Sequence, residues 1–128
     1  SFLVKHLRIN WTEGEKHFRN CLLDFNKANN VAQWQWVAGC GADAAPYFRI
    51  FNPILQGEKF DKEGIYVKKW VPELNKVPQK FIHKPWEMES KYQEAIETII
   101  GKNYPKPIVV HEQARAAALK AFQSLKKN

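Results

Sequence analysis

The run from residue 34 to residue 61 constrains the fold more than any other part of the sequence. It is too long, and too dense in aromatic, small and turn-forming residues, to be one amphipathic helix. Trp34 and Trp36 lie shortly before Gly39, a residue type that commonly follows the last turn of a helix. Two later prolines disfavour helix at the residues before them. We therefore expect a packed loop over residues 39–53 whose polar and aromatic side chains form one wall of a binding site.

Two helices are predicted ahead of this loop. Thr12 and Glu15 have the spacing of a capping box, which indicates a helix over residues 13–25. A second helix is expected to begin near Asn29 or Asn30 and to end at the glycines that open the loop.

The rest of the chain shows helical periodicity and no sustained strand alternation. Residues 71–86 contain three prolines and are expected to form an extended connector. Trp70 and Trp86 are expected to fill the core, as most tryptophans in small domains do. The sequence therefore predicts an all-α fold, with further helical segments near residues 1–7, 54–60, 62–70, 92–100 and 114–125.

Size and charge limit the class of protein. The 128 residues carry a net charge of +7 and 45% of them are hydrophobic, which suits one globular unit. No apolar run approaches the ~20 residues that a membrane-spanning helix needs, so we expect a soluble, cytoplasmic protein. The basic excess is compatible with nucleic-acid binding, because lysine and arginine displace counterions from phosphates.

Cysteine and histidine do not indicate a metal site. Cys21 and Cys40 lack metal-ligand spacing and are expected to be free thiols. The four histidines lie far apart in the sequence, and we expect them to be surface or hydrogen-bonded side chains: His6, His17, His83 and His111.

Several long motifs follow one another in a fixed order. They are Ser1-Phe2-Leu3-Val4-Lys5, Trp34-Gln35-Trp36-Val37-Ala38-Gly39, Trp70-Val71-Pro72-Glu73-Leu74, Ile82-His83-Lys84-Pro85-Trp86 and Tyr104-Pro105-Lys106-Pro107-Ile108-Val109. Together they resemble the photolyase and cryptochrome family, in particular the C-terminal part of the FAD-binding domain of class I cyclobutane pyrimidine dimer photolyases. The resemblance implies that residues 1–128 are the helical C-terminal portion of a longer enzyme, whose antenna-binding domain and FAD diphosphate contacts precede this chain.

The turn from residue 24 to residue 30 is rich in Asp and Asn. On local chemistry alone these side chains cap the ends of two helices. The resemblance implies instead that Asp24, Phe25 and Asn26 lie against FAD. It also places Asn30 at N5 of the isoalloxazine ring, where an amide accommodates reduced flavin without imposing a charge. The family usually has a second Asp at the position of Asn26, and the change removes one carboxylate near the ring.

Three tryptophans acquire roles from the same resemblance. Trp34 corresponds to the tryptophan nearest the flavin in the family's photoreduction chain, and Trp11 corresponds to the middle member of that chain. Trp36 corresponds to an aromatic wall of the cavity that receives the flipped pyrimidine dimer, in keeping with the stacking of extruded bases on aromatic rings. Each helical residue turns by about 100°, so Trp34 and Trp36 point about 200° apart and can serve opposite sides of a helix.

Arg49 and Gln56 follow the tryptophans. The resemblance makes both residues DNA contacts at the rim of the lesion cavity, where they can meet phosphates without reading sequence. Structural alternatives stay open, because Arg49 can pair with Asp43 or Asp61 and Gln56 can cap a helix.

These correspondences predict a DNA photolyase, in which reduced FAD excited by blue light splits cyclobutane pyrimidine dimers in UV-damaged DNA. A folate or deazaflavin antenna pigment would bind outside this chain, and the chain alone is expected to hold FAD weakly or not at all. One alternative is a cryptochrome-type photoreceptor, against which the Trp-Gln-Trp form argues. Another is a helical fragment that binds DNA or merely folds, without flavin.

Overall fold

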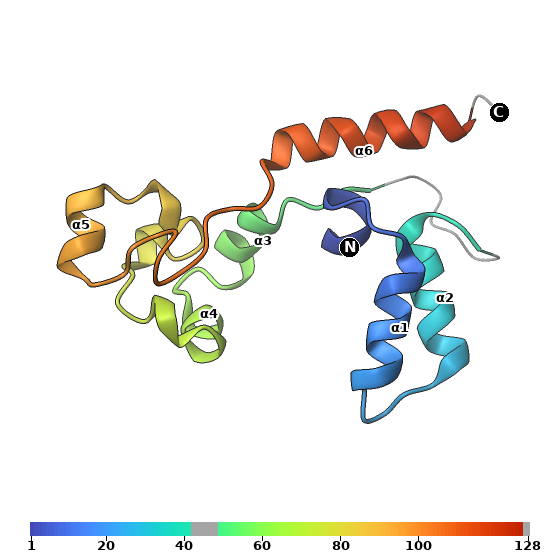
Figure 1. Cartoon of the computed structure of the whole chain (residues 1–128), viewed down its shortest axis with the longest axis horizontal. Helices are drawn as coiled ribbons and strands as arrows, with labels where there is room; N and C mark the ends of the chain where they lie inside the picture. Colours follow the sequence, from blue (N-terminus) through green and yellow to red (C-terminus); the bar gives the residue numbers. More distant parts are fainter. Residues whose placement is uncertain (42–48, 127–128) are drawn as a thin grey trace. The chain divides into compact units, whose positions relative to one another are not determined.

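The computed structural model describes residues 1–41 and 49–126, so the middle of the predicted loop, residues 42–48, lies outside the described residues (Figure 1). The elements are η1 (Phe2–His6, a π-helical turn), α1 (Trp11–Cys21), α2 (Lys27–Ala38), α3 (Pro53–Phe60), α4 (Ile65–Trp70), the 3₁₀ turns η2 (Pro72–Leu74), η3 (Gln79–Phe81) and η4 (Pro85–Glu87), α5 (Ser90–Ala95) and α6 (His111–Lys126). The described residues form no strand, apart from an isolated bridge between Ile100 and Tyr104. The all-α prediction is confirmed.

The chain divides into two compact units. Unit 1 comprises residues 1–50 and 109–128, and unit 2 comprises residues 51–108. Within the described ranges, no helix combines the length and the apolar character needed to cross a membrane.

Helix α1 starts earlier than predicted, because a different residue caps it. Asn10 is the N-cap, and its side-chain oxygen accepts a hydrogen bond from the Thr12 amide at 3.0 Å. Glu15 does not complete a capping box, since its carboxylate accepts hydrogen bonds from Arg19 instead. The predicted capping box is therefore wrong. The helix ends at Cys21, short of its predicted end, because the next residue is extended with ψ of 127°.

Helix α2 also starts ahead of its predicted position. Asn26 is the N-cap, and its side-chain oxygen accepts from the Asn29 amide at 3.1 Å. The helix ends at Ala38, followed by Gly39 with φ of 76°, a left-handed conformation that glycine adopts without strain. The predicted end of this helix is confirmed.

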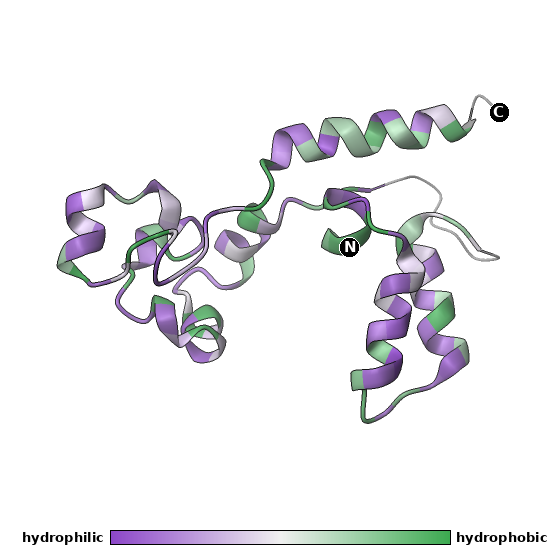
Figure 2. Ribbon diagram, viewed as in Figure 1, coloured by the Kyte–Doolittle hydropathy of each residue, from purple (hydrophilic) through white to green (hydrophobic). Residues whose placement is uncertain are grey.

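Unit 1 is built on α1 and α2, which pack against each other and against η1. Helix α1 is largely hydrophilic (Figure 2), so few apolar side chains hold the helix pair together. Phe18 on α1 meets Trp34 on α2 edge to face, with ring centroids 5.1 Å apart and an interplanar angle of 75°. Helix α6, predicted from its periodicity, packs on η1 and buries Ala118.

The core of unit 2 is small and comes mainly from turns. Leu74, Val77 and Ile82 are almost fully buried, and Met88 joins them. Gly64 packs on this core with φ of 71°, and a Cβ atom there would lie 2.5 Å from Cγ1 of Ile82. Both the conformation and the space therefore require glycine.

The helices α3 and α4 are fixed by side-chain caps. Asn52 caps α3 through its side-chain oxygen, which accepts from the Ile54 amide at 3.1 Å. Asp61 accepts from the amides of Tyr66 and Val67, each at 3.1 Å. Helix α4 consequently begins at Ile65, three residues after the start of the predicted segment at residue 62.

Residues 71–86 are not the extended connector that was predicted. They contain three successive 3₁₀ turns, and Pro72 and Pro85 occupy the first positions of two of them, where a missing N–H is tolerated. The prediction that the flanking tryptophans fill the core is also wrong: Trp70 is 63% exposed and Trp86 is 36% exposed. Aliphatic side chains of the turns occupy the core in their place.

Helix α5 ends at Ala95, within the segment predicted to be helical up to residue 100. Glu97 has φ of 57°, a left-handed conformation that ends a helix. The Gln93 side chain then holds the following segment, because its Oε1 accepts from the Ile100 amide at 2.9 Å.

Candidate functional site

A hollow of about 390 Å³ lies beside the α1–α2 hairpin of unit 1. Residues of both helices and of the turn between them line it, among them Phe18, Asp24, Asn26, Asn30, Gln33 and Trp34. Aromatic, amide and carboxylate groups thus converge on one concave surface, as they do in many small-molecule sites. Four of the residues singled out from the sequence share this hollow.

Asn30 is buried at 7% exposure and is held firmly in this wall. Its Nδ2 donates to the Glu15 backbone oxygen at 2.9 Å and to Oε1 of the same residue at 3.2 Å. Glu15 is itself 4% exposed and pairs with Arg19, whose Nη2 lies 2.5 Å from Oε2. Both amide hydrogens of Asn30 therefore have partners, and Oδ1 is the atom left to accept a hydrogen bond from a ligand.

Trp34 lies in the same wall and depends on a glycine of the facing helix. A Cβ atom on Gly14 would lie 2.2 Å from Cη2 of the Trp34 indole. The absence of a side chain at Gly14 therefore lets the indole approach α1 closely. The Phe18 ring also contacts this indole, in an edge-to-face arrangement.

The residues of the turn between α1 and α2 were considered both as helix caps and as ligand contacts, and they differ in which role their position fits. Asp24 lines the hollow, and its carboxylate makes no hydrogen bond or ion pair with the residues that the structure describes. Asn26 lines the hollow as well, while its side-chain oxygen caps α2. The capping role and a ligand-facing position therefore coexist at Asn26. Phe25 is 37% exposed and is not among the lining residues.

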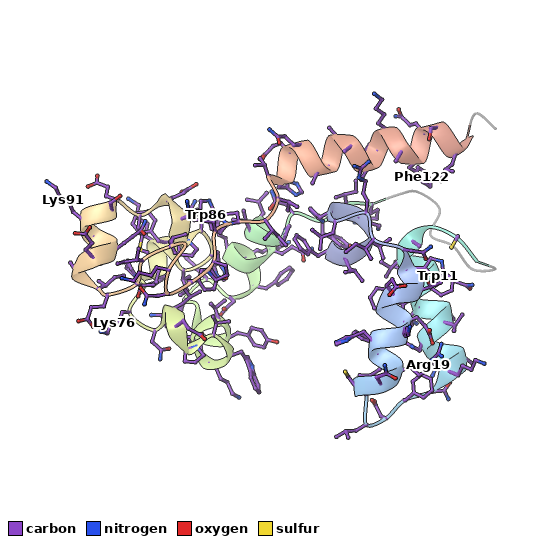
Figure 3. The ribbon with its side chains drawn as sticks, in the orientation of Figure 1. Trp11, Arg19, Lys76, Trp86, Lys91 and Phe122 are labelled. Carbon is purple, nitrogen blue, oxygen red and sulfur yellow. The ribbon has the colours of Figure 1, made fainter. Side chains whose placement is uncertain are left out.

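Trp11, labelled in Figure 3, lines a different hollow of unit 1, of about 410 Å³. Its neighbours there include Ala38 at the end of α2, and Ala118 and Phe122 on α6. The structure therefore does not bring Trp11 and Trp34 into one cavity, although both project from the same pair of helices.

Trp36 lies on α2 and is not among the residues that line the hollow beside Trp34. Trp36 is 44% exposed. Residues two apart on a helix point about 200° apart, which agrees with Trp34 lining the hollow and Trp36 not lining it.

The two predicted rim residues belong to different units. Arg49 in unit 1 is exposed, and its backbone oxygen accepts a hydrogen bond from Lys5 Nζ. Asp43, one of its alternative partners, lies outside the described residues. Gln56 is exposed within α3 of unit 2, and Asn52 caps that helix, so Gln56 is not its cap.

Sequence reasoning missed the residues that support the site from behind. Glu15 was assigned to a helix cap, although its buried carboxylate holds Asn30. Its four-residue spacing from Arg19 was the available signal, because residues at this spacing share one helix face. No local signal marked Gly14, whose role depends on the packing of the second helix.

No three His, Cys, Asp or Glu side chains gather to hold a metal ion in the described part of the chain. Two histidines that the sequence gave no reason to connect do meet: Nε2 of His6 lies 2.9 Å from Nδ1 of His111. His17 approaches the sulfur of Cys21 at 3.8 Å on the exposed face of α1.

Comparison with known proteins identifies a family for this fold and site. Residues 1–124 match the family described as the FAD binding domain of DNA photolyase. The chain is 57% identical over 127 residues to a deoxyribodipyrimidine photo-lyase of Agrobacterium fabrum, covering 99% of this chain and 26% of that protein. The Escherichia coli protein of the same name is 49% identical over 127 residues, with the same coverage of 99% and 26%. The chain thus spans about a quarter of the length of these curated relatives.

Two solved structures share the fold. A class III photolyase from Agrobacterium tumefaciens superposes with a TM-score of 0.91 at 56% identity, covering 99% of this chain and 26% of that chain. A cryptochrome from Synechocystis superposes with a TM-score of 0.86 at 37% identity, covering 93% and 24%. Since the first neighbour is of class III, the assignment to class I stays a prediction. The helical fold, the family match and these relatives together show that the chain belongs to the family of the FAD-binding domain of DNA photolyases.

Proposed function

We propose that the protein containing this chain is a cytoplasmic DNA photolyase and that unit 1 supplies one wall of its flavin and lesion site. The observation that carries the proposal is the single hollow lined by both the anchored Asn30 amide and the Trp34 indole. The shared name of the curated relatives, deoxyribodipyrimidine photo-lyase, supports it. Residues of this hollow would hold one side of FAD, which when bound would supply the light-driven electron transfer that splits a pyrimidine dimer.

Asn30 is the residue that we expect to face N5 of the flavin. Because Glu15 occupies both hydrogens of its amide nitrogen, Asn30 presents Oδ1, an acceptor, to the hollow. N5 carries a hydrogen in the reduced cofactor, so this fixed acceptor favours the reduced form. Glu15 is therefore the residue that orients Asn30.

Asp24, Phe25 and Asn26 would complete the flavin contacts of this wall. Asp24 brings a carboxylate with no protein partner among the described residues, whereas Asn26 brings an amide whose oxygen already caps α2. Asn26 stands where the family usually has a second Asp, so this wall carries one negative charge fewer. A less negative wall favours electron-rich flavin more than a wall with both carboxylates would. The antenna pigment, a folate or deazaflavin, would bind outside this chain.

The 128-residue chain alone is expected to bind FAD weakly or not at all. It covers about a quarter of the length of its relatives, and its hollow would contact only one edge of the flavin. A fluorescence titration of FAD with the purified chain measures this affinity. We expect a dissociation constant well above about 1 µM. Submicromolar binding would show that this wall holds the cofactor by itself.

We propose that Trp34 and Trp11 pass electrons toward the flavin during its photoreduction. Trp34 lines the proposed flavin hollow, and Trp11 is the first residue of the facing helix α1. An indole in each position offers an oxidisable ring within the same helix pair. Their role concerns preparation of the cofactor, whereas repair itself requires direct transfer between flavin and dimer.

Trp36→Ala is expected to weaken binding of dimer-containing DNA to the full-length flavoprotein by about 1–3 kcal/mol, the usual contribution of an aromatic stack on a base. The exposed ring of Trp36 would stack on the extruded lesion, while Trp34 stays on the flavin side. Flavin photoreduction should be unchanged. Fluorescence anisotropy with dimer-containing and undamaged duplexes measures both affinities.

Arg49→Ala is the matched control for this experiment. The exposed Arg49 and Gln56 are proposed to contact phosphates at the rim, and such contacts read no sequence. The Arg49 variant should therefore lose affinity for damaged and undamaged DNA alike, with a salt dependence reduced by about one phosphate contact. If Trp36→Ala lowered the affinity for damaged and undamaged duplexes equally, the assignment of Trp36 to the lesion cavity would be wrong.

A cryptochrome-type photoreceptor is the second candidate, because a Synechocystis cryptochrome shares the fold with a TM-score of 0.86. The two candidates differ in whether the flavin electron reaches a dimer. A full-length protein that binds FAD and undergoes photoreduction, yet leaves dimers intact under blue light, would support the photoreceptor.

A further inference from the structure

The contact between His6 and His111 joins two segments that lie 105 residues apart in sequence. His6 belongs to η1 and is 6% exposed, whereas His111 is the first residue of α6. Nε2 of His6 lies 2.9 Å from Nδ1 of His111, and the Phe2 ring stacks on His6 with centroids 5.1 Å apart. One partly buried hydrogen bond between two titratable rings thus connects η1 to the start of α6.

The burial of His6 decides which ring donates. Nδ1 of His6 is buried and has no hydrogen-bond partner among the described residues. A hydrogen on that nitrogen would be an unsatisfied buried donor, which is costly. We therefore assign the hydrogen to Nε2 of His6, which donates to the bare Nδ1 of His111.

An added proton opposes this arrangement at either ring. On His6 it creates the unsatisfied donor at Nδ1. On His111 it turns the accepting nitrogen into a second donor that faces Nε2 of His6. Neutral rings are therefore the state that fits the contact.

The charged groups around His6 also favour its neutral form. Burial lowers the pKa of His6, and the charges of His111, the Ser1 amino group and Lys5 lower this pKa further. These are the groups that act on His6 from η1 itself and from α6, and none of them is acidic. The Lys5 side chain is held in place, because its ammonium donates a hydrogen bond to the Arg49 carbonyl.

We propose that the His6–His111 contact is a pH-sensitive latch that docks the start of α6 on η1 and opens as the pH falls. Helix α6 packs directly on η1, and η1 packs in turn on α1 and α2. Ser1, at the edge of η1, lines the same hollow as Asn30 and Trp34. Release of α6 would therefore loosen the element that supports this wall. The latch does not depend on the proposed function.

The sign of the pH effect follows from the two protonation states. A released histidine has a pKa of about 6.5, whereas the pKa of docked His6 is lower. Between these two values the released state binds more protons. The stabilising effect of the latch is therefore fully present above about pH 6.5 and is lost as the pH falls toward the pKa of docked His6. For one proton, the docking equilibrium constant falls by at most about tenfold per pH unit.

NMR of the 128-residue chain between pH 8 and pH 5 tests the latch. The Ala118 methyl group reports docking, because it is buried on α6 across a hollow from Val4 of η1. We expect its signal to move from the docked to the released position as the pH falls below about 6.5. An Ala118 signal that keeps its docked position down to pH 5, or a pKa of His6 at or above 6.5 in the ring titration, would overturn the proposal.

Three controls separate the latch from general acid effects. In His6→Gln, the amide can donate to neutral His111 or, after rotation, accept from the protonated ring, so docking should not change with pH. His17→Gln removes an exposed histidine of α1 and should leave the pH response intact. N-terminal acetylation removes the Ser1 charge and should shift the response without abolishing it. A pH response in His6→Gln equal to that of the unchanged chain would contradict the assignment.

Discussion

Replacing Trp34 by phenylalanine in the full-length flavoprotein is expected to abolish light-driven reduction of oxidised FAD almost completely. Phenylalanine retains an aromatic ring against Gly14 and Phe18, so the wall of the hollow should survive the change. It does not retain the readily oxidised indole. Repair of dimers by chemically reduced protein should remain close to that of the unchanged protein. Absorbance during illumination measures the first activity, and dimer loss from an oligonucleotide measures the second.

Trp36→Phe is the matched control on the same helix. Trp36 is not among the residues that line the hollow beside Trp34, so its replacement should not slow photoreduction. If Trp34→Phe lost both activities in equal measure, or lost its bound FAD, Trp34 would be a structural residue of the flavin wall rather than an electron carrier.

Helix ends could be predicted where the deciding chemistry is local. Gly39 ended α2 as expected, because a left-handed residue after the last turn is a property of glycine itself. The start of α1 was less determined. Asn10 and Thr12 can both cap a helix, and asparagine is the stronger N-cap, but the spacing of Thr12 and Glu15 favoured a capping box. The structure selects Asn10, which frees Glu15 to turn toward α2.

The candidate site could be predicted only in part. The family resemblance singled out Asp24, Asn26, Asn30 and Trp34, which do share one hollow. Their separate roles at a flavin stay predictions. Glu15 could not be foreseen as the partner of Asn30, because that contact exists only once α1 and α2 are packed.

Unit 2 shows why residue type alone misplaces a core. Tryptophan is commonly buried, yet Trp70 is 63% exposed on a helix of only 6 residues. The successive turns after it bring Leu74, Val77 and Ile82 together more compactly than an extended connector could. The prolines signalled breaks in helix correctly, but they did not reveal that the breaks would fold into 3₁₀ turns.

Gly14→Ala is expected to destabilise unit 1, although alanine normally favours a helix. In an unhindered helix the change stabilises by roughly 1 kcal/mol. Here the added Cβ would lie between 2.2 and 2.6 Å from three carbon atoms of the Trp34 indole. Because the ring is also in contact with Phe18, overpacking of this kind should cost about 1–3 kcal/mol. Urea denaturation followed by tryptophan fluorescence measures the free energy of unfolding.

The same substitution in a Trp34→Ala background decides whether the indole is the cause. Without the ring, the three atoms nearest to a methyl group at Gly14 are gone, so the sign of the effect should reverse and alanine should stabilise the chain. The coupling free energy between positions 14 and 34 would then be several times the difference in helix propensity between glycine and alanine. Stabilisation by Gly14→Ala in both backgrounds would show that the Trp34 ring can move aside, and that Gly14 is not what keeps it in the wall of the hollow.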